Sequence, residues 1–362
     1  MKKKVLFVAS EFAPGMIPFA ATIINTMANC HELEVHCLCV NSGKCTYKGL
    51  IRATANPVFV EYPQSKLKKL YYKFWPVSII KALNRLRHEI KPDVVHFLTG
   101  DFTLANYAHL HKSPSFYYTV HDLHPHEVNK DNFFQRMFHK YIMSSNERMH
   151  RRIDNLTTSS LSQIEELRQL YPTKNIQFTH FPTLVTEKIA YGKMGVKELN
   201  EIQHYILFFG NVDVYKGVDL LVKAFTKSGI KEKCKLVIAG RGYLKIQSND
   251  NIVRIDRFIE DEELGELFKN ARFVVYPYRS VTMSGVLSLA FYFHKRVLLS
   301  NIPFFKENAC ELTSFFKNGD IGDLEKMLDC LLDKEKMAFD NCYDRIYSRA
   351  VLIRDYLKLY NV

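Results

Sequence analysis

The stretch that most constrains the fold is residues 273–301, FVVYPYRSVTMSGVLSLAFYFHKRVLLSN. It begins with an apolar run at 273–276, which predicts a buried strand that Pro277 ends. A helical pattern starts at Val286, and a second apolar run at 297–299 closes the stretch. A strand, a loop, a helix and a strand in this order predict a parallel sheet with helices packed against it.

The loop of this stretch contains a candidate anion site. Ser284 and Gly285 come just before the predicted helix, where unpaired backbone N–H groups and the positive end of the helix dipole meet. A phosphate is the anion that such a position suits best. The alternative is that Ser284 only caps the helix.

The chain has 362 residues, which is enough for two domains of roughly 150–200 residues each. Apolar strands alternate with helical patterns through both halves, and this alternation predicts two doubly wound α/β domains. We place these domains at residues 1–185 and 200–340, with a polar connector over 182–203. Residues 341–362 are predicted to form a terminal helix.

Composition excludes several classes of protein. Hydrophobic residues make up 47% of the chain and charged residues 24%, which is ordinary for a soluble globular protein. No apolar segment approaches the roughly 18–20 residues of a membrane span. The apolar run near the start is too short for a signal peptide, because Glu11 follows at once. The eight cysteines form no CxxC pair, so we expect reduced thiols in a cytoplasmic protein.

The net charge of +12 is concentrated in the first half, where residues 1–180 hold 23 Lys and Arg against 14 Asp and Glu. This excess favours an anionic partner. The sequence contains no nucleic-acid-binding motif, which leaves an anionic membrane surface or an anionic substrate.

Residues 66–75 show the basic residues interleaved with apolar ones. That pattern is typical of a surface that lies on anionic lipid. A solvated helix with one buried face is the alternative. The lysines are Lys66, Lys68, Lys69 and Lys73, and the apolar residues are Leu67, Leu70, Tyr71, Phe74 and Trp75.

Two positions in the first half are candidates for ligand binding. Gly15 follows the first predicted strand and lets a phosphate or a sugar approach the backbone, or it only forms a turn. His121 ends the predicted strand at 115–120, and open α/β sheets bind ligands outside the carboxyl ends of their strands. Two more histidines follow, but a proline separates them and their spacing does not fit a metal site, so we predict no metal. The missing GxGxxG fingerprint argues against a nicotinamide cofactor.

Three loops of the second half carry groups that suit a diphosphate. Lys216 offers a point charge, Arg241 offers a planar fork of donors, and Ser284 with Gly285 offers backbone N–H groups. The loops follow successive strands of one predicted sheet, so we expect them to share its carboxyl edge.

The second half contains GNVDVYKGVDLL, LVIAGRG and PYRSVTMSGVLSLA, and the first half contains TVHDLHPH. On these motifs the chain resembles family-4 retaining glycosyltransferases of the GT-B fold. It looks most like bacterial members that make capsular, exopolysaccharide or lipopolysaccharide glycans. The resemblance covers nearly the whole chain, with its weight on residues 205–301. It implies two Rossmann-like domains that face a cleft, with a C-terminal helix that crosses back to the first domain.

The resemblance also implies roles for individual residues. Lys216 would neutralise the leaving diphosphate with help from backbone donors at Ser284 and Gly285, and His121 would lie beside the donor sugar. A nucleotide-diphosphate sugar would be the co-substrate, with no cofactor and no metal, since cationic side chains stabilise the developing charge. Further donor-binding candidates are Gly15, Asn211, Arg241 and Thr282.

The chain departs from the family at two points. A pair of glutamates that the family uses to hold the donor sugar and the ribose falls here at Thr282 and Ala290. The family also has an arginine near Asn211, which Arg241 is the candidate to replace. The sequence therefore does not specify the donor sugar or its nucleotide.

These features predict a cytoplasmic, metal-independent retaining glycosyltransferase with peripheral contact to the anionic inner membrane surface. Its acceptor would be a lipid-linked glycan or an oligosaccharide. One alternative is a non-catalytic protein that binds nucleotide or glycan and assists another glycosyltransferase. Another is a sugar-nucleotide epimerase, which would need a buried acid–base pair that the sequence does not reveal. Fold alone decides none of these.

Overall fold

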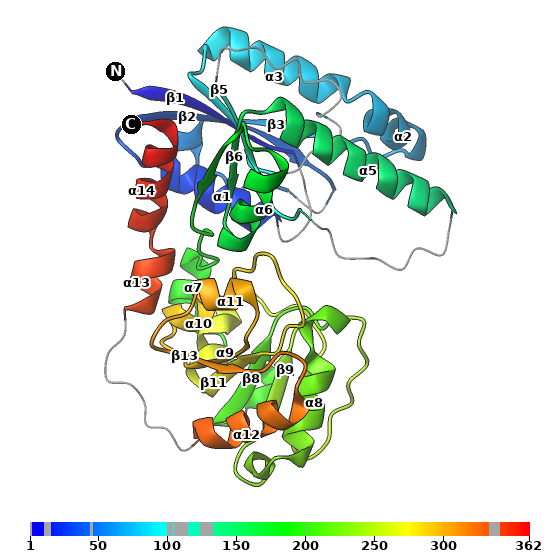
Figure 1. The fold of residues 1–362 in the computed structure, drawn as a ribbon, viewed down its shortest axis with the longest axis vertical. Helices are drawn as coiled ribbons and strands as arrows, with labels where there is room; N and C mark the ends of the chain where they lie inside the picture. Colours follow the sequence, from blue (N-terminus) through cyan, green and yellow to red (C-terminus); the bar gives the residue numbers. More distant parts are fainter. Residues whose placement is uncertain are drawn as a thin grey trace. The chain divides into compact units, whose positions relative to one another are not determined.

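The computed structural model describes residues 2–10, 16–43, 46–99, 104, 115–123, 133–200, 202–332 and 341–362. The chain forms two compact α/β units (Figure 1). The N-terminal unit consists of Met1–Pro182 and Arg349–Val362, and the C-terminal unit consists of Thr183–Ser348. Both units have the Rossmann-like architecture predicted from the sequence.

Seven parallel strands, within the described residues, form the sheet of the N-terminal unit in the order β3-β2-β1-β4-β5-β6-β7. The strand predicted at 115–120 is present. The strand order reverses between β1 and β4, so the switch point of this sheet lies there. The strands are β1 (Lys3–Ala9), β2 (Leu33–Asn41), β3 (Pro57–Glu61), β4 (Val94–Phe97), β5 (Ser115–Thr119), β6 (Asn155–Thr158) and β7 (Asn175–Phe178).

Helices cover both faces of this sheet, which explains why its strands are almost continuously apolar. On β1, Phe7 and Ala9 pack toward α1 and α14, while Leu6 and Val8 pack toward α3 and α6. The basic residues predicted at 66–75 lie on one helix, α2, with Trp75 as its C-cap, and Pro76 separates it from α3. The helices are α1 (Met16–Met27), α2 (Lys66–Phe74), α3 (Val77–Ile90), α5 (Phe133–Arg152), α6 (Leu161–Leu170) and α14 (Arg349–Tyr360), with a 3₁₀ turn η1 (Ala53–Ala55).

The C-terminal helix α14 is anchored on the sheet of the N-terminal unit by buried hydrogen bonds. Nδ1 of His96 lies 2.6 Å from the Tyr360 hydroxyl, and Nε2 lies 2.9 Å from Oγ1 of Thr119. Burial lowers the pKa of His96 to about 3, so this ring is neutral at physiological pH. The predicted return of the chain to the first domain is confirmed. The single predicted terminal helix is wrong, because Ser348 is extended and separates α13 from α14.

The sheet of the C-terminal unit is parallel and has six strands among the described residues, in the order β10-β9-β8-β11-β12-β13. Its order reverses between β8 and β11. The strands are β8 (Tyr205–Phe209), β9 (Leu236–Ala239), β10 (Ile252–Ile255), β11 (Ala271–Tyr276), β12 (Val297–Ser300) and β13 (Thr313–Phe316). The helices are α7 (Glu187–Tyr191), α8 (Val218–Lys227), α9 (Leu264–Lys269), α10 (Val286–Tyr292), α11 (Pro303–Glu307), α12 (Ile321–Leu332) and α13 (Cys342–Tyr347), and the 3₁₀ turns are η2 (Lys197–Leu199), η3 (Val214–Lys216), η4 (Gly229–Glu232) and η5 (Asp261–Glu263).

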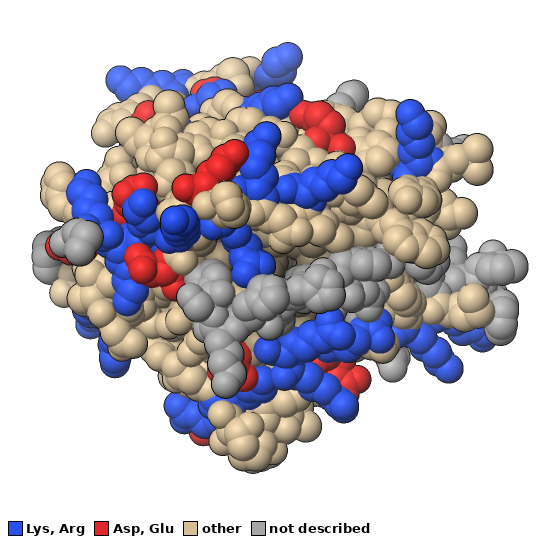
Figure 2. Space-filling view, turned by 90° about the horizontal axis from the view of Figure 1, so that it is seen from above, with Lys and Arg blue, Asp and Glu red and all other residues tan. Residues whose placement is uncertain are grey.

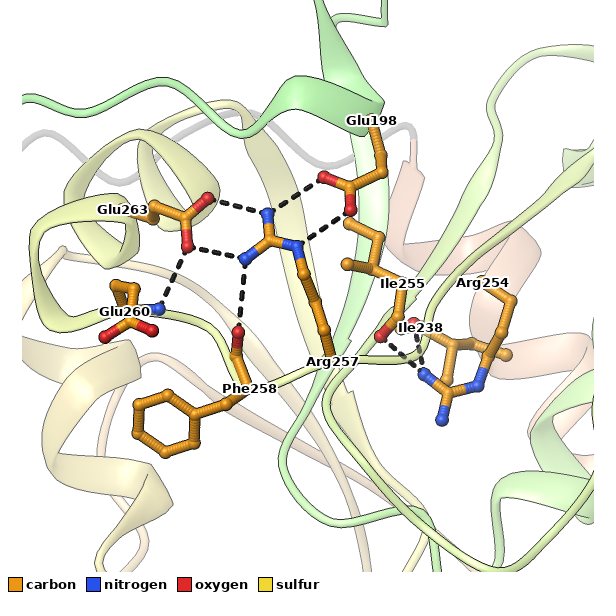
Figure 3. Close-up of polar contacts among 8 residues, drawn as sticks. All are labelled: Glu198, Ile238, Arg254, Ile255, Arg257, Phe258, Glu260 and Glu263. Carbon is orange, nitrogen blue, oxygen red and sulfur yellow. Dashed lines mark hydrogen bonds and ion pairs between the residues drawn. The ribbon is translucent and has the colours of Figure 1, made fainter.

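The predicted polar connector is folded onto the C-terminal unit. Its residue Glu198 accepts two hydrogen bonds from Arg257, at 2.8 and 2.9 Å. The other side of the same guanidinium donates to Glu263 at 2.6 and 2.7 Å (Figure 3). These carboxylates raise the pKa of Arg257. The paired guanidinium links the connector, through Glu198, to Glu263 of the C-terminal unit.

One expectation about the cysteines is wrong. Cys310 and Cys342 form a disulfide with their Cα atoms 5.9 Å apart. Sequence spacing gave no sign of it, because 32 positions separate the two residues and the pair meets only when α13 packs beside α10. The bond attaches α13 covalently to the C-terminal unit, just before the chain returns to the N-terminal unit.

Counting thiols tests this disulfide. Of the eight cysteines, two are in the bond, so six should react with a thiol reagent in denatured, unreduced protein. All eight should react after reduction. Cys310→Ser leaves seven cysteines without a disulfide, and its count should not change on reduction. Eight reactive thiols in unreduced wild-type protein would contradict the bond.

Among the described residues, none of the helices combines the length and the apolar character needed to cross a bilayer.

Candidate active site

The candidate donor site lies at the carboxyl edge of the C-terminal sheet, at its switch point. The loops after β8, β9 and β11 follow three neighbouring strands, so Lys216, Arg241 and Ser284 belong to one edge, as predicted. Open α/β sheets bind ligands at this position, because the loops on either side of the switch point diverge.

A tight backbone holds Lys216 in place. The 3₁₀ turn η3 ends at Lys216, and Gly217 follows with a φ of +64°. A Cβ at Gly217 would lie 2.0 Å from the carbonyl oxygen of Pro277, so a larger residue does not fit. The turn after β8 is therefore pressed against the loop after β11.

The ammonium of Lys216 is buried without a carboxylate partner. The side chain is 8% exposed, and Nζ donates to the Tyr278 hydroxyl at 3.0 Å while lying 4.8 Å from the centre of that ring. None of the ion pairs among the described residues includes Lys216. Burial lowers its pKa, and Tyr215 and Asp213 oppose this effect. A buried cation held by neutral groups gains stability when an anion binds beside it.

Gly210 leaves room next to this ammonium. Its φ is +132°, and a Cβ there would come within 3.3 Å of Nζ of Lys216. The absence of a side chain lets a ligand oxygen approach the backbone where the lysine ends.

In the loop after β11, Ser284 does not cap the helix that follows. Gly285 is the N-cap of α10, and no side chain caps that helix, so the proposal that Ser284 is only a cap is wrong. Ser284 is instead hydrogen-bonded with Tyr278. Thr282 and Ser284 are half-buried and Gly285 is buried, so this loop presents a polar surface over a packed base.

Asn211 and Arg241 occupy neighbouring loops, and both have exposed side chains. The backbone N–H of Val212 donates to the carbonyl of Arg241 at 2.7 Å, which fixes the two loops together. Arg241 is therefore placed on the same edge as Lys216. Another arginine of this edge, Arg279, is already paired with Asp219 at 2.7 and 2.8 Å.

His121 lies at the carboxyl edge of the N-terminal sheet, directly after β5, as predicted. Its Nε2 is 2.7 Å from the carbonyl oxygen of Leu98, and its ring packs edge-on against Phe19 with centroids 4.6 Å apart. A carbonyl only accepts, so Nε2 carries the hydrogen and Nδ1 is left as an acceptor. Nδ1 is buried without a partner. Burial lowers the pKa of His121 to about 4, so the imidazole is neutral at neutral pH.

The amide of Gln163 fixes the backbone around His121. Its Nε2 donates to the carbonyl of His121 at 3.3 Å and to Oγ1 of Thr158 at 3.0 Å, and its Oε1 accepts from the N–H of Leu123 at 2.9 Å. Both N–H groups of this buried amide therefore donate, and its oxygen accepts one hydrogen bond. These bonds fix the start of the loop after β5.

Serine and threonine hydroxyl groups also lie at the carboxyl edge of the N-terminal sheet. The N–H of Ser10, at the end of β1, donates to Oγ1 of Thr99 at 3.0 Å. The Oγ atoms of Ser10 and Ser159 are both buried without a partner. Gly15, and the two histidines after His121, lie outside the described residues.

Two tyrosines that lie beside Lys216 were not predicted from the sequence. Tyr278 is the fully buried partner of the ammonium, and the ring of Tyr215 lies 5.7 Å from Nζ. The only signal for Tyr278 was its position directly after Pro277, at the end of an apolar strand. Nothing in its spacing separates it from the other buried tyrosines of the chain.

Two family models match the chain. The one described as Glycosyltransferase Family 4 matches residues 19–185, and the one described as Glycosyl transferases group 1 matches residues 203–334. No curated protein sequence matches the chain.

Several solved structures share its fold. HepE from Anabaena, in complex with UDP and glucose, is 12% identical over 99% of each chain, with a TM-score of 0.70. Sucrose-phosphate synthase from Thermosynechococcus elongatus is 12% identical over 99% of this chain and 98% of that one, with a TM-score of 0.68. WaaG, a glycosyltransferase involved in lipopolysaccharide biosynthesis, is 14% identical over 99% and 94%, with a TM-score of 0.57.

The two family models identify the chain as a glycosyltransferase, and its two parallel sheets and the solved neighbours show the GT-B fold. Within that class the chain is family-4-like, since its first half matches the family 4 model and its second half matches the group 1 model. The resemblance inferred from the sequence motifs is confirmed.

Proposed function

We propose that this protein is a retaining, metal-independent glycosyltransferase that uses a nucleotide-diphosphate sugar and extends a lipid-linked glycan of the bacterial surface. The observation that carries the proposal is the buried ammonium of Lys216 at the switch point of the C-terminal sheet. A diphosphate leaving group gains negative charge as the sugar departs, and a preorganised cation in a dry site stabilises that charge.

Other residues of the two edges support this reaction. Ser284 and the backbone at Gly285 offer further donors to the diphosphate, and Arg241 offers a second cation. Nδ1 of His121 is an acceptor without a partner, which suits a hydroxyl group of the donor sugar. A neutral imidazole positions the sugar without acting as a nucleophile. With the charge met by protein cations, the reaction does not require a metal ion.

The solved neighbours favour one donor class. HepE has been solved with UDP and with UDP-glucose, so a UDP-sugar is the first donor to test. WaaG acts in lipopolysaccharide biosynthesis, which supports a surface glycan as the product. The absence of carboxylates at Thr282 and Ala290 leaves the particular sugar open.

A donor screen tests the proposal. Purified protein is incubated with UDP-glucose and other nucleotide sugars, with lipid-linked acceptors and with EDTA, and release of nucleoside diphosphate is measured. We expect acceptor-dependent release in EDTA, and a product whose anomeric configuration matches that of the donor. Binding of UDP without any release would instead favour a non-catalytic partner of another glycosyltransferase.

We further propose that α2 contacts the anionic inner membrane surface, in keeping with a cytoplasmic protein that acts on lipid-linked glycans. Leu67, Leu70, Tyr71 and Trp75 are exposed, with Leu67 83% exposed, while Tyr72 is buried in the core. Large apolar side chains that stay exposed beside basic ones favour a lipid surface over a simple solvated helix.

Basic side chains near α2 also favour contact with an anionic lipid surface. Lys68 is exposed and Lys69 is half-buried, whereas the side chains of Lys66, Lys73 and Phe74 lie outside the described set. Figure 2 shows that Lys and Arg side chains are more widespread than Asp and Glu on the face seen from above in Figure 1.

We expect the protein to sediment with vesicles that contain anionic lipid, and to be released by high salt. Replacing Lys66, Lys68, Lys69 and Lys73 by serine should lower vesicle binding by about a hundredfold or more, since each lysine near such a surface contributes about 1 kcal/mol. The control replaces Lys223, Lys227, Lys233 and Lys235, which carry the same charge on the other unit. Equal losses in both variants would show that only total charge matters and would reject α2 as the membrane surface.

A further inference from the structure

The hydroxyl of Tyr278 lies between two groups that the proposed function assigns to the donor diphosphate. It accepts a hydrogen bond from Nζ of Lys216 at 3.0 Å, and it is hydrogen-bonded with Ser284. Lys216 belongs to the loop after β8, and Ser284 belongs to the loop after β11. One buried hydroxyl therefore joins the two loops on either side of the switch point.

The direction of these hydrogen bonds follows from the chemistry of the groups. An ammonium only donates, so the Tyr278 oxygen accepts from Lys216 and keeps its own hydrogen. Burial raises the pKa of Tyr278, so the phenol stays protonated and has this hydrogen to give. Ser284 lowers the pKa of Tyr278 through their side-chain hydrogen bond, which is the effect of a serine hydroxyl that donates to the phenol oxygen.

The position of the Tyr278 hydroxyl is fixed by its surroundings. The ring is fully buried and lies 5.3 Å from that of Phe305 and 5.7 Å from that of Tyr276. Its carbonyl accepts from Oγ of Ser300 at 2.5 Å. A ring held on several sides and a backbone held by β12 leave the hydroxyl little freedom to move.

We infer that Tyr278 is a positioning residue of the donor site. It holds the Lys216 ammonium and the Ser284 side chain so that both meet the same phosphate group of a nucleoside diphosphate. The inference rests on the proposed function, because it takes the edge at Lys216 as the diphosphate site. Beyond that function, it assigns to Tyr278 the role of keeping Lys216 and Ser284 next to each other.

A tyrosine that only fills the core makes different predictions. Its loss would lower stability, and it would affect nucleotide binding equally whether or not Lys216 is present. A positioning tyrosine acts through Lys216 and Ser284, so removal of its hydroxyl matters only while those groups are there.

The first experiment removes one oxygen atom. Tyr278→Phe keeps the ring and should weaken UDP binding, measured by calorimetry, by about three- to tenfold, as expected for a lost hydrogen bond to a charged group. The matched control is Tyr276→Phe. Tyr276 is also fully buried on the same segment, and its hydroxyl donates to the carbonyl of Val286 at 3.4 Å rather than contacting Lys216. That variant should keep the parent affinity.

A double-mutant cycle separates positioning from packing. In a Lys216→Met background, Tyr278→Phe should change UDP affinity by a smaller factor than in the parent, because the charged partner is gone and only the contact with Ser284 remains. An unchanged affinity in the single variant, or the same loss in both backgrounds, overturns the inference.

A second readout does not depend on nucleotide. The amine of Lys216 is acylated by acetic anhydride only when deprotonated, and mass spectrometry follows the reaction as a function of pH. The charged or titratable groups near this amine are Asp213, Tyr215 and Tyr278. Removing the Tyr278 hydroxyl takes away an acceptor of the ammonium, so the labelling profile should move to lower pH.

The two readouts distinguish the possible failures. If the parent protein binds no UDP while Tyr278→Phe still shifts the labelling profile, the donor assignment fails and the contact between Tyr278 and Lys216 stands. If UDP binds but neither its affinity nor the labelling profile responds to Tyr278→Phe, the positioning role is rejected and the donor site stands.

Discussion

Replacing Lys216 by alanine is expected to reduce both turnover and nucleotide-diphosphate affinity by about ten- to a hundredfold, the equivalent of a lost charge-assisted hydrogen bond worth roughly 1.5–3 kcal/mol. The reason is local. The ammonium is buried beside neutral tyrosines and belongs to none of the ion pairs among the described residues. The ammonium is therefore available to a ligand, and a diphosphate is the anion that the proposed donor would release.

The effect should appear in kcat as well as in binding. Negative charge on the leaving diphosphate grows as the bond to the sugar breaks. Removing the cation therefore takes more stabilisation from the transition state than from the ground state. Turnover and UDP affinity are measured on the same preparations, with the melting temperature as a test of folding.

Lys227→Ala is the matched control for this experiment. Lys227 ends α8, the helix that follows Lys216, and its side chain is exposed. The control should retain parent activity. Normal turnover in Lys216→Ala, together with unchanged affinity for UDP and for the donor, would remove Lys216 from the site.

Much of this site was predictable because the hydrophobic pattern indicates where each strand of the sheet ends. The apolar runs at 205–209 and 273–276 are followed by glycine and proline, which places the loops after them at the carboxyl edge of a parallel sheet. Lys216, Arg241 and Ser284 were found on that edge because each follows a strand of one parallel sheet. The strand β13 was not predicted, since three of its four residues are only partly buried and it begins with Thr313 and Ser314.

The partners of these residues were not predictable, because they depend on contacts between distant segments. Tyr278 reaches Lys216 across 62 positions, and Arg279 is withdrawn from the site by a pairing with Asp219 across 60. Neither pairing leaves a periodic signal in the sequence. The same reason applies to the disulfide, whose two cysteines meet only after α13 has packed.

Replacing His121 by alanine is expected to lower turnover by about a hundredfold while changing UDP affinity and melting temperature little, since positioning of a reactant is worth several kcal/mol. The ring is neutral, because burial lowers its pKa to about 4, and its Nδ1 has no partner. A buried acceptor without a partner is costly in the free protein. We expect that a hydroxyl group of the donor sugar fills this position during the reaction.

His96→Ala is the control for this experiment, because it removes a buried histidine with a structural role. His96 lies two residues before Leu98, the partner of His121, but both of its ring nitrogens are already hydrogen-bonded within the N-terminal unit. Its loss should lower the melting temperature and leave the activity of the folded fraction intact. If His121→Ala behaves in the same way, with reduced stability and parent turnover in the folded protein, His121 is structural and the acceptor for the donor sugar lies elsewhere on this edge. Ser10 and Ser159, whose hydroxyl oxygens are also buried without partners, are then the next residues to replace.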